Sequence, residues 1–384
     1  MEMIYLDHAA TTPVHPEVAA VVQDVMSNCF GNPSTLHAIG REARGLLDKA
    51  RQQVADLICA RPEEIFFTSG GTEADFLALW GVVSSRKGRG SHIITSSIEH
   101  HAVLNNCAYL AELFDCRVTY LPVDGAGMVD PDDVRRAIER ETALISIMHA
   151  NNEVGTIEPV EEIAAIAREE GIPFHVDAVQ TVGHLPIDVN RLGVDLLSLS
   201  GHKFYGPKGV GALYVRQGTP FTAVLRGGGQ ERGYRSGTEN IPGIAGLGQA
   251  ADIARRDLEE ETQRLQRLRD ALIQGIEERI PGARLNGHRT RRLPHNVNFS
   301  FPDVEGESLV LGLDLQGIAV SSGSACSSGT GEPSHVLRSL GLPESYLNGA
   351  VRMTLGRANT EEDIPVVIEA LEGLVRKLGR LFSA

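Results

Sequence analysis

The sequence predicts an α/β protein in which a large domain, built on a mostly parallel sheet, is followed by a smaller α+β domain. Between residues 65 and 176, short apolar runs typical of strands alternate with longer runs of helical periodicity. Such alternation favours a parallel sheet with helices on both faces. A long, increasingly charged helical pattern from residue 238 to about 280 then leads into a mixed region. The 384 residues are enough for two or three domains.

The individual elements follow from the spacing of apolar residues. Near the N-terminus we expect a strand at residues 4–6, a helix at 18–26, a polar loop at 30–34 and an amphipathic helix at 39–58. The alternating region predicts strands at residues 65–68, 92–95, 117–122, 143–148, 173–176 and 194–199, with helices from residue 72 and at 102–114, 131–140 and 160–169. After the long helix we expect strands at 296–301, 318–321 and 351–355, a helix at 307–316 and a closing helix from residue 360.

The composition bounds the class of protein. A hydrophobic content of 42% and a charged content of 22% are ordinary for a soluble globular chain. No apolar run approaches the ~20 residues of a membrane helix, and the first residues do not form a signal peptide. A net charge of −14 argues against general nucleic-acid binding. The basic stretch at residues 288–292 is interpreted as a solvated loop, and we expect no membrane or direct nucleic-acid partner.

The five cysteines predict neither a disulfide framework nor a structural metal site. Their number is odd and none forms a C-x-x-C pair. Such usage fits a reducing, cytoplasmic compartment. Cys326 differs from the other four because it lies among serines, glycines and other small residues at 321–331. These residues cannot pack a core, so the pattern indicates an exposed, reactive cysteine; a flexible linker with an incidental cysteine is the alternative.

Polar residues gather where the expected strands end, which is where ligands bind in such sheets. The glycines of the turn at residues 68–72 precede a helix, so their N–H groups and the helix dipole can hold a phosphate, with Thr72 adding a hydroxyl. A plain tight turn is the alternative. His100 follows another strand and can stack on a flat ligand or transfer a proton, although a lone histidine is more often structural. The amide-bearing stretch at 149–153 reads most simply as a capped turn.

A buried carboxylate and a lysine complete the pattern. Asp177 ends an apolar strand, so it needs a cationic or strongly donating partner. Lys203 follows the strand at residues 194–199, where desolvation can make its amine nucleophilic; a surface lysine in a turn is the alternative. Pyridoxal phosphate needs a lysine for a Schiff base, an acid against its pyridinium nitrogen and a phosphate cradle. The combination therefore favours this cofactor over a flavin or nicotinamide, because no G-x-G-x-x-G follows the first strand.

Four motifs resemble the NifS/IscS-type, group I cysteine desulfurases of the aminotransferase class V family. They are YLDHAATT at residues 5–12, GNPS at 31–34, SGHK at 200–203 and SGSAC at 322–326. The resemblance covers essentially the whole chain. It implies a fold-type I pyridoxal-phosphate transferase with a mostly parallel seven-stranded sheet. The implied domains are a large one at 14–255 and a smaller α+β one at 1–13 and 256–384, which carries Cys326.

The resemblance also implies a role for each matching residue. Lys203 would form the Schiff base, Asp177 would pair with the pyridinium nitrogen, and His100 would stack on the ring and act as acid and base. The remaining cofactor contacts within the same chain would come from Asn152, Gln180, Gly71, Thr72, Ser200 and His202. The partner subunit would add Thr238. Arg352, helped by Asn32, would bind the substrate carboxylate. No resident metal is implied, and a role for Cys326 in ligating a transferred iron–sulfur cluster stays open.

The implied reaction converts L-cysteine to L-alanine and leaves the sulfur on Cys326 as a persulfide, in a homodimer. The chain ends at Ala384, soon after the closing helix, whereas the IscS type has an extension that docks the scaffold protein. This difference argues against the usual iron–sulfur scaffold partnership, so the acceptor is expected to be a tRNA-thiolating enzyme or another sulfur acceptor as well as an iron–sulfur scaffold. A selenocysteine lyase, another class V pyridoxal enzyme and a non-catalytic sulfur carrier are the alternatives.

Overall fold

The computed structural model describes residues 3–86, 91–322 and 333–382, and its largest sheet has seven strands. Their order is β2-β8-β7-β6-β5-β3-β4. All neighbours pair in parallel except β8, which is antiparallel to both β2 and β7. The strands are β2 (Ile65–Thr68), β3 (His92–Ser96), β4 (Arg117–Leu121), β5 (Thr142–Ser146), β6 (Phe174–Asp177), β7 (Leu196–Ser200) and β8 (Gly211–Val215). The mostly parallel seven-stranded sheet is confirmed.

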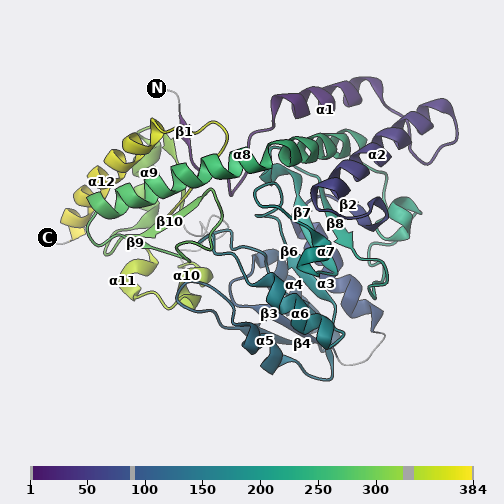
Figure 1. Ribbon diagram of the computed structural model, residues 1–384, viewed down its shortest axis with the longest axis horizontal. Coiled ribbons are helices and arrows are strands. Elements are labelled where there is room, and N and C mark those ends of the chain that lie inside the picture. Colours follow the sequence, from purple (N-terminus) through teal and green to yellow (C-terminus); the bar gives the residue numbers. More distant parts are fainter. Residues whose placement is uncertain (1–2, 87–90, 323–332, 383–384) are drawn as a thin grey trace.

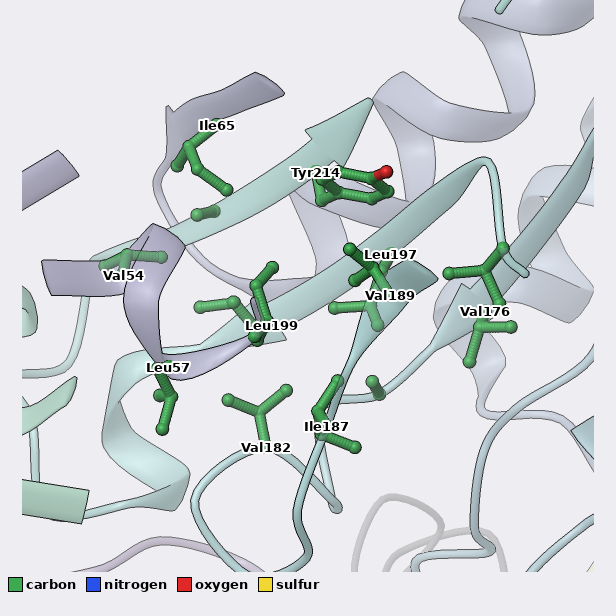
Figure 2. Close-up of a cluster of buried hydrophobic side chains, with 14 of the residues drawn as sticks. Val54, Leu57, Ile65, Val176, Val182, Ile187, Val189, Leu197, Leu199 and Tyr214 are labelled. Carbon is green, nitrogen blue, oxygen red and sulfur yellow. The ribbon is translucent and has the colours of Figure 1, made fainter. Parts of the chain in front are cut away.

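Helices cover both faces of this sheet because successive strand residues point to opposite sides. Ile94, Ile145 and Leu197 belong to one buried cluster, whereas their neighbours Ile93 and Leu144 belong to the other. Figure 2 shows part of the first cluster, where side chains of β6, β7 and β8 meet those of α2. The helices are α1 (Pro16–Asn28), α2 (Ala38–Leu57), α3 (Gly71–Ser85), α4 (His101–Phe114), α5 (Pro131–Ala137), α6 (Val160–Glu169) and α7 (Val189–Leu192). Helices α3 and α4 pack on the second cluster.

A 39-residue helix, α8 (Ile241–Arg279), joins this large unit to a smaller one (Figure 1). Its first third, up to Ala254, packs into the large core, and its residues from Leu265 to Ile276 pack into a separate core. The smaller unit contains a four-stranded antiparallel sheet of order β12-β13-β10-β9 and the parallel pair β1-β11. Its elements are β1 (Ile4–Tyr5), β9 (Arg284–Leu285), β10 (Asn296–Ser300), α9 (Gly306–Asp314), β11 (Ile318–Ala319), β12 (Ser321–Ser322), α10 (His335–Ser339), α11 (Glu344–Leu347), β13 (Ala350–Thr354) and α12 (Asp363–Phe382).

Two local differences from the sequence prediction have simple causes. Strand β8 was not predicted, because its five residues follow directly on a run of glycines that reads as a turn. The strand expected at 318–321 is two short strands in different sheets, and Val320 lies between them. In the described part of the chain, no helix is long and apolar enough to span a membrane.

Candidate functional site

A cavity of about 390 Å³ opens at the carboxyl ends of the parallel strands and collects most of the predicted site residues. The predicted residues that line it are Gly71, Thr72, His100, Asn152, Asp177, Gln180, Ser200, His202, Lys203 and Arg352. They come from positions up to 281 residues apart, and the strand ends of the sheet bring them to one edge, as the topology requires. The wall also includes Ala9 and Ala10, from the segment that follows β1.

Lys203 lies in a single turn of 3₁₀-helix, Gly201–Lys203, immediately after β7. Its Nζ donates to the backbone oxygens of Ala9, at 2.5 Å, and Ala10, at 2.9 Å. The ring of His184 contacts the Lys203 backbone oxygen through Nε2 at 3.0 Å. The amine is therefore held at the cavity wall rather than on the outer surface, and its position depends on the N-terminal segment.

Two carboxyl groups, Asp177 and Asp75, lie at the same cavity and are both buried. Asp177 ends β6, and its Oδ1 accepts from the Val179 N–H at 2.9 Å. Burial raises the pKa of Asp177 to about 6, against the opposing effect of the Lys203 charge. Burial, followed by repulsion from Asp177, raises the pKa of Asp75 well above its ordinary value. The pair therefore favours a single negative charge and can balance a cation placed beside Asp177.

His175 lies beneath these acids and is fully buried and neutral. Its ring nitrogens contact the hydroxyls of Ser146 and Ser198, each at 2.9 Å, and its Nε2 is 3.6 Å from Asp75 Oδ1. Burial lowers the pKa of His175 to about 3, so it adds no charge near neutral pH. Asp75 Oδ1 has no hydrogen-bond partner among the residues that the structure describes. A neutral, fully buried ring therefore lies beside the Asp75 carboxyl.

Gly71 and Thr72, at the start of α3, form another part of the cavity wall. Gly70 has φ 154°, a conformation that favours glycine, and a Cβ on Gly71 would lie 2.6 Å from Val179 Cγ2. The backbone can therefore approach closely here, with the positive end of the helix dipole directed to the cavity. Ser200 and His202 lie on the adjoining wall, in a second hollow of about 420 Å³ that continues past Thr72 to Lys208.

His100 is the N-cap of α4, and this position settles where its proton lies. Its Nδ1 accepts from the Ala102 N–H at 3.1 Å, so in the neutral ring the proton is on Nε2. Burial, and then the charge of Lys203, lower the pKa of His100 to about 4. The ring is therefore a neutral, flat wall with a donor. His101 and His335 also line the cavity, and their rings contact each other at 4.7 Å.

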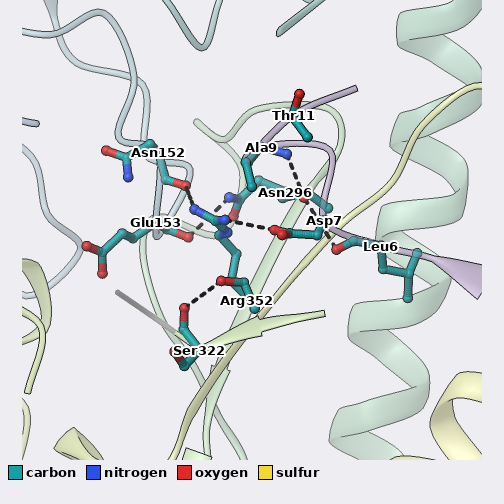
Figure 3. Close-up of polar contacts among 12 residues, drawn as sticks. Leu6, Asp7, Ala9, Thr11, Asn152, Glu153, Asn296, Ser322 and Arg352 are labelled. Carbon is teal, nitrogen blue, oxygen red and sulfur yellow. Dashed lines mark hydrogen bonds and ion pairs between the residues drawn. The ribbon is translucent and has the colours of Figure 1, made fainter. Parts of the chain in front are cut away.

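Arg352, on β13, is the buried cation at the end of the cavity next to the smaller unit (Figure 3). Its Nη1 donates to the Asn152 backbone oxygen at 3.0 Å, and its Nη2 pairs with Asp7 Oδ1 at 2.9 Å. The side chain of Asn152 lies nearby, and Asn152 also lines the cavity. A guanidinium has five N–H groups, so donors remain for a further anion.

Glu153 was not predicted as a site residue, although it lines the cavity. Its carboxyl accepts from Ser334 Oγ at 2.5 Å, and its backbone oxygen accepts from the side chains of Asn296 and Asn298. Burial raises the pKa of Glu153 to about 7, against the Arg352 charge. Asp75 was missed as well, although its spacing of one helical turn from Thr72 was a usable signal.

Three predicted residues lie elsewhere. Asn32 and Thr238 are exposed and are not among the described residues that line the cavity. The side chain of Asn32 caps its own turn, where Oδ1 accepts from the Ser34 N–H. Cys326 lies outside the described residues. The roles of these three residues, like those of the residues that line the cavity, stay predictions.

Comparison with known proteins gives consistent matches over nearly the whole chain. The model of the family described as "Aminotransferase class-V" matches residues 4–367. A protein named cysteine desulfurase IscS, from Dictyoglomus turgidum, is 52% identical over 375 residues, which cover 98% of this chain and 95% of that protein. A solved structure titled "NIFS-LIKE PROTEIN" is 39% identical, with a TM-score of 0.91 over 98% of this chain and all of that one. A structure of SspA in complex with cysteine is 38% identical, with a TM-score of 0.80 over 92% of this chain and 98% of that one.

Proposed function

This chain belongs to the aminotransferase class-V family, and we propose that it is a pyridoxal-phosphate-dependent cysteine desulfurase. The proposed reaction converts L-cysteine to L-alanine and moves the sulfur to Cys326. The observation that carries the proposal is the single cavity that holds Lys203, Asp177 and Arg352. An amine nucleophile, a buried acid and a carboxylate-binding guanidinium are the groups that this cofactor and an amino-acid substrate require.

The residues of the cavity fit the cofactor. A pyridinium nitrogen would balance the single negative charge that the Asp75–Asp177 pair favours. A phosphate would fit at the backbone N–H groups of Gly71 and Thr72, at the start of α3. His100 would cover one face of the ring, and Gln180 and Asn152 would lie at its edge. When bound, the cofactor draws electrons away from the substrate's α-carbon.

The chain's own residues then divide the remaining work. Arg352 would bind the substrate carboxylate, and the amine of Lys203 would move the α-proton. His100 provides a second proton site at Nε2. Its pKa of about 4 keeps it neutral, so it does not repel the cationic form of Lys203.

Cys326 is proposed to take the sulfur. Its sulfur forms a bond to the substrate sulfur while the substrate carbon–sulfur bond breaks, and the remaining three-carbon unit takes up a proton and leaves as alanine. The flanks of residues 323–332 support this role. Ser321 pairs with Arg352 across the β12–β13 ladder, and Ser334 bonds Glu153 in the cavity wall. Cys326 is four positions after Ser322 in the sequence, so their Cα atoms are at most about 14 Å apart.

We further propose a cytoplasmic homodimer with a shared site. The exposed position of Thr238 agrees with a contribution to the site of the partner copy. The proposed domain boundary near residue 255 lies in α8, between the stretches that pack into the two cores. The sulfur acceptor is proposed to be an iron–sulfur scaffold protein or a tRNA-thiolating enzyme.

The test is whether the purified, cofactor-loaded protein forms alanine from L-cysteine with sulfide released by a thiol reductant. Lys203→Ala should abolish alanine formation, and Arg352→Lys should raise the KM for cysteine, because a lysine cannot bind the carboxylate bidentately. Turnover of selenocysteine with no measurable turnover of cysteine would instead support the lyase alternative. A wild-type protein that carries the cofactor and forms no alanine would refute the proposal.

A further inference from the structure

The buried guanidinium of Arg352 has a counter-ion that does not line the cavity. Asp7 Oδ1 is 2.9 Å from Arg352 Nη2, in an ion pair whose side chains are 20% and 3% exposed respectively. Figure 3 shows Asp7 reaching Arg352 from the N-terminal segment. Among the described residues that line the cavity, Arg352 is included and Asp7 is not. Asp7 therefore acts on a ligand only through Arg352.

The position of Asp7 is built by its neighbours. Its backbone forms a bridge to Thr354, two residues along β13 from Arg352. The Thr354 N–H donates to the Leu6 backbone oxygen at 2.6 Å, and the Ala9 N–H donates to Thr354 Oγ1 at 2.9 Å. The hydroxyl of Tyr5 donates to the Asp7 backbone oxygen at 3.1 Å. These contacts on both sides of Asp7 fix its carboxylate relative to the arginine.

The other nearby acid does not duplicate this role. The carboxyl of Glu153 accepts from Ser334, and among the described residues Asp7 is the ion-pair partner of Arg352. With Asn152 on Nη1 and Asp7 on Nη2, two of the five guanidinium N–H groups are used, and Nε has no hydrogen-bond partner in the described parts of the chain. The guanidinium is oriented, its charge is balanced, and it still has donors for a carboxylate.

We propose that Asp7 is a positioning residue that orients Arg352 and, by its negative charge, holds the affinity of the site for α-carboxylates at a moderate level. This inference rests on the proposed role of Arg352 as the carboxylate-binding residue. The substrate and the product alanine carry the same carboxylate, so an unbalanced guanidinium would bind both more tightly. The negative charge of Asp7 behind the guanidinium should lower the affinity of Arg352 for a ligand carboxylate by about tenfold.

The closing experiment separates the charge of Asp7 from its hydrogen bond. Asp7→Asn keeps an oxygen acceptor at the same place and removes the charge, whereas Asp7→Ala removes both. L-alanine is titrated into the cofactor-loaded protein, and its dissociation constant is read from the cofactor absorbance. L-alaninamide, which lacks the carboxylate, is titrated in parallel. Asp270→Asn is the matched control, because Asp270 pairs with another buried arginine, Arg269, in the smaller unit.

For Asp7→Asn, the dissociation constant of alanine should be about tenfold lower than in the wild type, and that of alaninamide should be unchanged. The KM for cysteine should fall without a rise in kcat. Asp7→Ala should bind alanine more weakly than Asp7→Asn, because Arg352 loses its orientation. Asp270→Asn should match the wild type. If Asp7→Asn does not fold, Asp7→Ser, a smaller neutral acceptor, should also tighten alanine binding.

Two outcomes would overturn the inference. One is an alanine affinity in folded Asp7→Asn, or in Asp7→Ser if Asp7→Asn does not fold, that equals or falls below that of the wild type. The other is an equal change for alanine and alaninamide, which would mean that the cavity has changed shape. Failure of the proposed function gives a different result, because the wild-type protein itself would then form no alanine from L-cysteine.

Discussion

Asp177→Asn is the substitution that most directly tests how the cavity holds its cofactor. Asp177 is 6% exposed and ends β6 at the cavity. A hydrogen bond to a charged partner contributes about 1.5–3 kcal/mol, and asparagine retains only a neutral contact to a ring nitrogen. The dissociation constant of the cofactor should therefore rise by about 10- to 150-fold. The reaction rate should fall further, because the ring nitrogen is no longer held in its protonated form.

Asp75→Asn is the matched control in the same cavity. Burial and the charge of Asp177 raise the pKa of Asp75 well above its ordinary value, so replacing Asp75 with asparagine should change the charge of the cavity less than replacing Asp177 does. The cofactor dissociation constant of Asp75→Asn should stay within about threefold of the wild type, a difference of less than 1 kcal/mol. Both substitutions replace a carboxyl group with a carboxamide, so the difference between their cofactor dissociation constants reports the effect of the Asp177 charge.

The assay is a titration of the cofactor-free protein with pyridoxal phosphate, followed by absorbance, with thermal unfolding of each variant as the check on folding. Equal affinities for the wild type and Asp177→Asn would refute the assignment of the ring-nitrogen partner. A loss in Asp75→Asn as large as that in Asp177→Asn would also count against it, because the two carboxyls would then be equivalent.

Two further substitutions test the packing around the site. Burial raises the pKa of Glu99 to about 8, so this residue destabilises the folded state as the pH rises above about 4.5, its pKa in the unfolded chain. Glu99→Gln should therefore have an unfolding free energy about 2–4 kcal/mol higher than that of the wild type at pH 8, measured by urea unfolding of the cofactor-free protein. A difference that does not grow with pH would contradict this prediction. A Cβ on Gly356 would overlap the ring of His8, so Gly356→Ala should lower the unfolding free energy by about 1–3 kcal/mol. In α12, a Cβ on Gly373 would meet nothing within 4 Å, so Gly373→Ala should raise the unfolding free energy by up to about 1 kcal/mol.

The sequence was informative where local chemistry decides the structure. The alternation of strands and helices, the turn at residues 68–72 and the acid at the end of β6 could be predicted, because apolar periodicity and strand ends are local features. The functional class could be predicted because four motifs, at residues 5–12, 31–34, 200–203 and 322–326, resemble those of the cysteine desulfurases. Lys203 alone did not distinguish a surface turn from a site.

Long-range contacts could not be predicted in the same way. Arg352 reads as a charge on a strand edge until Asp7, 345 residues earlier in the chain, is placed beside it. The backbone oxygens of Ala9 and Ala10 that hold Lys203 carry no sequence signal, because every residue has such a group. Glu153 was missed because its importance comes from burial at a shared cavity, which only the tertiary structure determines, whereas Asp75 had a usable signal in its helical spacing from Thr72.

The most direct test of the central claim is the mass of the peptide that contains Cys326 after a single turnover. The cofactor-loaded protein is mixed with L-cysteine, without reductant, and alanine is measured in the same sample. The peptide should gain the mass of one sulfur atom, in an amount equal to the alanine formed, and Cys326→Ser should show neither the added mass nor a matching amount of alanine. Full alanine formation by Cys326→Ser, or sulfur found on another cysteine of the wild type, would contradict the proposed transfer to Cys326.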